Sequence, residues 1–198
     1  MAALHLVGMI SPGPDFIVVV RNSLKFTHQA GRWTALGIAA GLLVHLTYCI
    51  IGIGFIISQS IVLFNILKYL GAAYLICLGI MSFMSKEEGV GVTQEEVHQG
   101  SLSSWAAFKM GFYVNMLNPK VTLAFVSIFA AFVTPETGLK LQLLFATFAV
   151  TSAVVWFSFV ASVFSFKKVQ LVYAKARNRI DRTVGVVLVS LGLRVVDV

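Results

Sequence analysis

The chain has 198 residues, of which 58% are hydrophobic and 12% charged, with a formal net charge of +7. Its mean hydropathy of +0.89, with a charged fraction far below the roughly 25% of soluble domains, excludes an ordinary soluble protein and predicts an all-α membrane protein. The apolar runs do not alternate as membrane β-strands do, and the basic residues flank these runs, which indicates topology rather than a nucleic-acid partner.

The first three predicted membrane segments lie at about 2–24, 35–57 and 62–83. The first is interrupted by Ser11-Pro12-Gly13-Pro14-Asp15, because proline removes a backbone donor and glycine loosens a helix. In the second, residues spaced four apart share one helix face, where small side chains let helices approach closely. These residues are Gly37, Gly41 and His45.

A polar stretch at 84–104 separates this first half, 1–83, from a second half, 105–198, and is expected to be a cytoplasmic linker. Segment four, 105–133, is interrupted by Asn118-Pro119, and segment five covers 141–166. Residues 167–182 form a basic amphipathic segment that we expect at the membrane surface. Segment six at 183–196 is short for a full crossing unless it starts within that basic run. The two halves are predicted to make one transporter domain.

Each half thus has three segments and opens with a proline-broken helix. Three crossings per half make the second half enter the membrane inverted, and interrupted segments in corresponding places point to a transporter binding site near the midplane. Lys and Arg concentrate in the connectors after segments one, three and five. The positive-inside rule therefore places both termini on the periplasmic side.

Several motifs together resemble the LysE/RhtB family of bacterial amino-acid exporters, and the first is closest to its threonine-exporter branch. They are Ser11-Pro-Gly-Pro-Asp-Phe16, the Gly37, Gly41, His45 run, Gly71-Ala-Ala-Tyr-Leu75 through Gly79, and Phe108, Gly111, Asn115 and Asn118-Pro119-Lys120. The resemblance implies six helices in a bacterial inner membrane and export of threonine, homoserine or lysine driven by the proton-motive force. Many members carry Asn where this chain has Asp15.

The two breaks supply the chemistry for an amino acid. Interrupted helices free amide and carbonyl groups, which are tolerated at membrane depth only inside protein or along a polar cavity. The positive end of a half-helix suits a carboxylate, and freed carbonyls or an acid suit an ammonium group. Ser11, Asp15 and Asn22 share roughly one face of segment one, and Asn115, Asn118 and Thr122 share a face of segment four.

Two hypotheses follow for the charged pair. Asp15 serves the substrate ammonium or proton coupling, and Lys120 serves the substrate carboxylate or pairs with Asp15 at rest, near the midplane. The alternative is that the pair only stabilises the interface between the halves. His45 is either a buried, hydrogen-bonded imidazole or a proton relay.

The remaining expectations concern packing, partners and competing functions. Small residues are expected at helix contacts, namely Gly37, Gly41, Gly79, Gly111 and Gly192. The partners are an amino acid, protons and the lipid bilayer, with no cofactor, and homo-oligomerisation stays open. Export of another small solute or cation is the first alternative, although Asp15 is the clear acid of the apolar segments. A membrane-embedded enzyme is disfavoured because no nucleophile-base pair or metal-ligand set converges.

Overall fold

A computed structural model describes the chain except for residues 11–12, 85–100, 135, 165 and 198. The described residues form helices and no strands. The predictions for Ser11, for Pro12 and for most of the 84–104 linker lie outside this part. The eight helices are α1 (Ala2–Ile10), α2 (Pro14–Lys25), α3 (His28–Gln59), α4 (Ile61–Met84), α5 (Ser104–Met116), α6 (Pro119–Phe132), α7 (Leu139–Val163) and α8 (Lys167–Asp197).

Three of these helices are long and apolar enough to cross a membrane, over residues His28–Gly52, Val62–Met84 and Leu139–Val163. Two further pairs meet the same criterion when each is taken as one bent span. α1 and α2 are inclined at 50° to each other, and α5 and α6 at 56°. The described residues therefore contain up to five spans by length and composition, as befits a multi-pass membrane protein.

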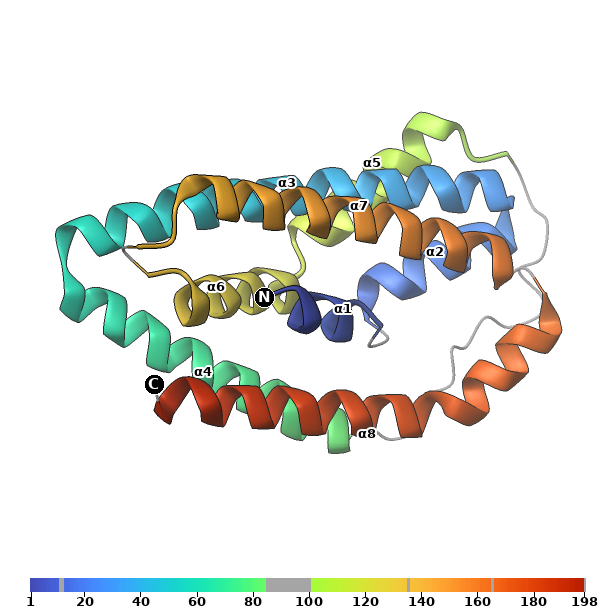
Figure 1. The fold of residues 1–198 in the computed structure, drawn as a ribbon. Helices are drawn as coiled ribbons and strands as arrows, with labels where there is room; N and C mark the ends of the chain where they lie inside the picture. The colour runs from blue at the N-terminus through green and yellow to red at the C-terminus, as the bar shows by residue number, and fades with distance from the viewer. Residues whose placement is uncertain (11–12, 85–100, 135, 165, 198) are drawn as a thin grey trace.

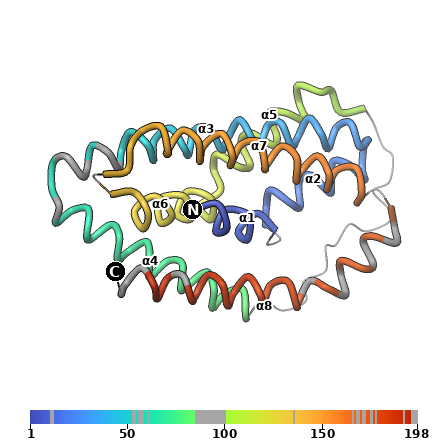
Figure 2. The backbone as a smooth tube through the Cα atoms, viewed as in Figure 1, coloured from blue at the N-terminus to red at the C-terminus, as the bar shows by residue number. Residues whose placement is uncertain are grey.

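The helices are arranged in layers (Figure 1). α3 and α7 run side by side along one side of the molecule, and α4 and α8 run side by side along the other. The short helices α1 and α6 lie between these two layers. The bend between α5 and α6 falls near the middle of the molecule in Figure 2. Asn118, at this interruption, is buried.

The last helix begins within the basic run, which is one of the two possibilities that the sequence leaves open. The basic run 167–182 and the short segment after it form a single helix, α8, of 31 residues. Its apolar end packs along α4, and Tyr173 in its basic part stacks on Phe16, with ring centroids 4.9 Å apart. Continuity is favoured because residues 167–197 contain no proline and Gly185 and Gly192 face another helix.

Glycines set the distance between two helix pairs. A methyl group added at Gly37 would meet the backbone of Phe108 in α5, and one added at Gly111 would meet the backbone of Thr34 in α3. In the α4–α8 pair, Gly79 faces Gly185, while Gly192 faces Ile76. These backbones lie too close for any side chain at the glycine positions, as in other closely packed membrane helices.

Candidate functional site

Asn118 and Pro119 build the break between α5 and α6. Asn118 caps α6, because its side-chain oxygen accepts the backbone N–H of Lys120 at 3.0 Å. Pro119 begins the helix, where its fixed φ is favourable and its missing donor is harmless to α6. The missing N–H does affect α5, since the carbonyl of Asn115 loses its usual donor four residues on.

That carbonyl accepts the backbone N–H of Asn118 at 3.0 Å, and His45 of α3 adds a second donor. Its Nε2 lies 3.0 Å from the carbonyl oxygen of Asn115, and its Nδ1 lies 2.6 Å from the Tyr48 hydroxyl. A carbonyl only accepts, so Nε2 carries a proton, and in the neutral ring Nδ1 accepts from Tyr48. His45 is 1% exposed. Its hydrogen bond to the Asn115 carbonyl supports the backbone at the break between α5 and α6.

Replacing His45 by phenylalanine is expected to destabilise the protein by about 0.5–1.5 kcal/mol, because the buried Asn115 carbonyl then loses its side-chain donor and keeps only the backbone N–H of Asn118. His45→Gln keeps an N–H donor and is expected to retain most of the stability. Thermal unfolding of the purified protein in detergent measures the difference. Equal losses in the two variants would contradict this role for the imidazole.

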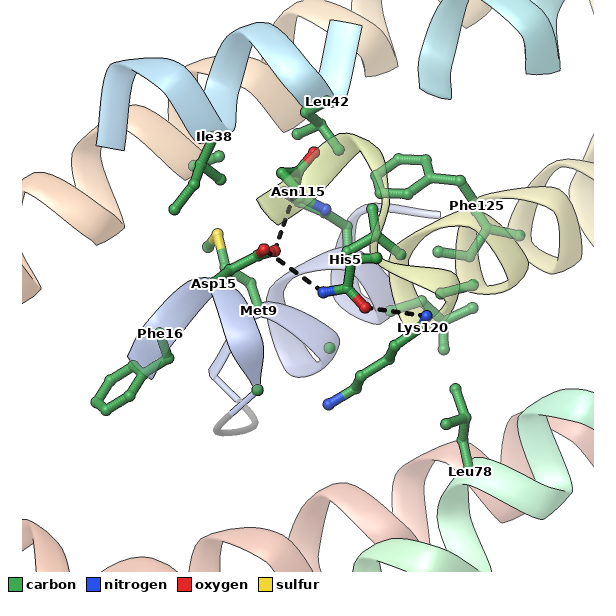
Figure 3. Close-up of a pocket in the computed structure, with 18 of the residues that line it drawn as sticks. His5, Met9, Asp15, Phe16, Ile38, Leu42, Leu78, Asn115, Lys120 and Phe125 are labelled. Atoms are coloured by element: carbon green, nitrogen blue, oxygen red, sulfur yellow. Dashed lines mark hydrogen bonds between the residues drawn. The ribbon is translucent and has the colours of Figure 1, made fainter. Parts of the chain in front are cut away.

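Asp15 lies in the first turn of α2 and is buried. Its Oδ2 accepts a hydrogen bond from the Asn115 side-chain amide at 2.9 Å, and its Oδ1 accepts one from Asn118 at 3.4 Å. Figure 3 shows both contacts reaching from the second break to the first. A carboxylate at the N-terminus of α2 also faces the positive end of that helix. The two halves therefore meet at one acidic group.

A cavity of about 90 Å³ opens beside this cluster. Asp15, Asn115, Asn118 and Lys120 line it, and Figure 3 shows Asp15 and Lys120 within the same cluster of lining residues. Most other lining residues are apolar, including Leu42, Leu75, Phe125 and Phe157.

Two residues expected on these polar faces lie elsewhere. Asn22 donates to the Thr34 hydroxyl at 2.8 Å and to the sulfur of Met110 at 3.3 Å, which places it where α2 meets α3 and α5. Thr122 donates to the Asn118 carbonyl of its own helix at 3.3 Å. Neither lines the cavity. Asn22 shares roughly one face of α2 with Asp15, but at the turn of Asn22 this face is covered by α3 and does not reach the cavity.

Sequence reasoning missed one polar residue of the cavity wall, His5 of α1. Its Nε2 lies 3.0 Å from the Ser152 hydroxyl. Because that hydroxyl donates to the carbonyl of Ala149, it accepts from His5, and Nε2 carries the proton. The imidazole also lies against Phe125, with ring centroids 5.6 Å apart. A histidine within the apolar run of residues 1–10 was the signal available in the sequence.

One buried acceptor at the site has no partner among the described residues. The side-chain oxygen of Asn115 is buried and accepts no hydrogen bond there. It lies against Gly41, where an added methyl carbon would come within 2.9 Å of it. Gly41 thus leaves room for the asparagine whose amide nitrogen holds Asp15.

Comparison with known proteins identifies the family. The LysE type translocator model matches residues 6–197. The chain belongs to the LysE type translocator family. A threonine efflux protein of Escherichia coli K12 is 26% identical over 198 residues, covering 99% of this chain and 95% of the relative. A leucine efflux protein of Salmonella choleraesuis is 33% identical over 159 residues, covering 75% and 72%.

Another relative of this LysE type translocator is an uncharacterized membrane protein, YrhP of Bacillus subtilis, which is 32% identical over 192 residues and covers 94% of this chain and 91% of the relative. No solved structure matches. The resemblance seen in the sequence motifs is confirmed, and so is the expectation of a transporter rather than an enzyme.

Proposed function

We propose that this LysE type translocator is a secondary transporter that exports an amino acid from the cytoplasm through the cavity between its two helix breaks. The observation that carries the proposal is the Asp15 carboxylate, held by Asn115 and Asn118 from the other half at the edge of that cavity. Relatives named for threonine and leucine efflux support an amino acid as the substrate.

The site offers a partner for each end of a zwitterion. The ammonium group of the substrate binds Asp15 and the carbonyl end of α1, where Pro12 and Pro14 deprive Gly8 and Ile10 of their usual donors. The carboxylate binds the Lys120 ammonium and the positive end of α6. Both charged side chains line the same cavity as Gly8, which supports this orientation.

The apolar walls favour a neutral side chain. Threonine, homoserine and lysine were all expected substrates from the sequence, but a second ammonium group among Leu42, Leu75 and Phe157 would lose hydration without a carboxylate to replace it. Threonine, homoserine or an aliphatic amino acid fits these walls better. Lysine is the least suited of the candidates.

We further propose the six-span arrangement of two inverted repeats, with α8 as the sixth crossing and both termini in the periplasm of a bacterial inner membrane. The two bends of 50° and 56° occupy corresponding places in the two halves, which supports the repeat. Proton-motive force drives export, and Asp15 is the group that exchanges a proton for the substrate ammonium. His45 remains the second candidate for moving that proton.

An export screen tests the proposal. Cells that overproduce the protein are loaded with each amino acid in turn, and the intracellular and external levels are compared with cells producing Lys120→Ala. A neutral amino acid is expected to leave the cells that carry the unchanged protein. If no amino acid distinguishes the two strains, the exporter assignment is wrong.

Gly8 offers a test of the cavity itself. A carbon added at Gly8 meets no atom within 4 Å, and the residue lines the cavity. Gly8→Val is therefore expected to fold normally and to fill part of the binding space, so that export of leucine falls more than export of threonine. Gly138→Val, at a second unobstructed glycine that precedes α7, is the control. Equal losses for both amino acids in Gly8→Val would contradict a size-selective wall.

A further inference from the structure

His5 of α1 is a polar residue of the cavity that the proposed contacts to the substrate ammonium and carboxylate leave unused. Its side chain is 6% exposed, and the residue lines the cavity. Leu4, Phe125 and Ala153 line the same cavity from α1, α6 and α7, and their side chains offer no hydrogen bond. The imidazole is therefore a polar group on an apolar part of the wall.

The hydrogen bonds of Ser152 fix the tautomer of this imidazole. Its Oγ donates its single proton to the Ala149 carbonyl at 3.0 Å and accepts from Nε2 of His5 at 3.0 Å. The imidazole also contacts three uncharged aromatic rings with centroids 5.6 to 6.4 Å away, those of Phe125, Phe145 and Phe148. An imidazolium among these groups would lose its hydration without a carboxylate to replace it, so the ring is neutral. A neutral imidazole protonated at Nε2 is an acceptor at Nδ1.

This Nδ1 acceptor receives no hydrogen bond from the residues that the structure describes. It is also not one of the buried polar atoms that lack a partner there, so it borders open space. The cavity is the open space that His5 lines. Because polar atoms inside a protein are normally hydrogen-bonded, Nδ1 indicates a donor supplied by a molecule in the cavity.

The position of His5 on α1 suits the side chain of a bound amino acid. Gly8, whose carbonyl is proposed to bind the substrate ammonium, lies three residues after His5, about 4.5 Å further along the same helix face. The hydroxyl of threonine or homoserine stands one or two carbon atoms beyond the α-carbon. A substrate held by its ammonium group at Gly8 can therefore extend its hydroxyl group to His5.

We propose that Nδ1 of His5 accepts a hydrogen bond from the side-chain hydroxyl of the substrate, so that the site prefers hydroxylated amino acids over aliphatic ones of the same size. The inference rests on the proposed function and names the substrate class within it. His5 is then a specificity-determining residue, and Ser152 is a positioning residue that acts through the tautomer of His5.

Threonine and valine test the inference because they have the same shape and differ by a hydroxyl in place of a methyl group. Binding of each tritiated amino acid to the purified protein in detergent gives the two Kd values. The unchanged protein is expected to bind threonine about tenfold more tightly than valine, which is the size of one good hydrogen bond. His5→Phe keeps an aromatic ring without the acceptor. Its two Kd values are expected to agree within about twofold, because the Kd of threonine rises.

Ser152→Ala is the second variant, since Ser152 contacts the imidazole but does not line the cavity. The change frees Nε2, so that the ring adopts either tautomer, and the preference for threonine is expected to fall to about threefold with the Kd of valine unchanged. Thr147→Ala is the control, because Thr147 is an exposed residue of α7 whose hydroxyl donates within its own helix. It is expected to keep the full preference.

Three results would contradict the inference. A preference for threonine that persists in His5→Phe, or an equal loss of affinity for both amino acids, would overturn the role of His5. Equal binding of threonine and valine by the unchanged protein would also overturn it, while export of a neutral amino acid would stand as proposed. Binding of neither amino acid would contradict the proposed substrates and the inference with them.

Discussion

Asp15→Asn is expected to lower export by about a hundredfold or more. The substitution keeps the size of the side chain and one acceptor oxygen for Asn115 or Asn118, but it removes the charge that the substrate ammonium needs. Loss of one partner from a buried charged pair costs about 3–5 kcal/mol, and each 1.4 kcal/mol changes affinity about tenfold. Uptake of threonine or leucine into inverted vesicles, driven by an imposed pH gradient, measures the loss.

The control for this variant is Glu136→Gln, which removes an exposed carboxylate from the connection between α6 and α7. Its uptake is expected to match that of the unchanged protein. Unaltered pH-driven uptake in Asp15→Asn would remove both the proton and the substrate role of Asp15. The same result would leave the carboxylate as a stabiliser of the interface between the halves.

The second large effect concerns folding rather than binding, and it arises at Gly37. A methyl group there would overlap the Phe108 carbonyl and approach the backbone nitrogen of Phe112 to 2.8 Å. Backbone atoms cannot move aside as a side chain does, so α3 and α5 must separate. Gly37→Ala is expected to destabilise the protein by about 1–3 kcal/mol or more, seen as a Tm lowered by several degrees in detergent.

Gly52→Ala is the matched control on the same helix, since a carbon added at Gly52 meets no atom within 4 Å. Replacing a helical glycine at such a position is expected to be neutral or to stabilise by up to about 1 kcal/mol. If the two variants unfold at the same temperature, close approach of α3 and α5 at Gly37 does not contribute to stability.

Gly41→Ala is also expected to lower export, because it displaces the Asn115 side chain that holds Asp15.

Local chemistry explains what the sequence could predict. Pro12, Pro14 and Pro119 each remove a backbone donor from an apolar run, so both breaks follow from residue identity alone. Asp15, Asn115 and Asn118 follow as predicted site residues because they lie beside those breaks. The structure brings Asp15, Asn115 and Asn118 into hydrogen-bond contact.

Tertiary packing explains what the sequence could not predict. The helical spacing of Asn22 relative to Asp15 is correct, but only the position of α3 decides that its amide meets Thr34 rather than the cavity. His5 gains its role from Ser152 in α7, far along the chain. Asp181 lies in a basic segment that the sequence predicts at the membrane surface, and nothing in the local pattern indicates that Asp181 is buried, as it is in the structure.

The most direct test is an experimental structure of the protein with the amino acid that the export screen identifies. The amino acid is expected in the cavity between the two breaks, with its ammonium group within hydrogen-bond distance of Asp15 and its carboxylate toward Lys120. An amino acid bound elsewhere, or Asp15 and Lys120 on opposite surfaces of the protein, would contradict the proposed site.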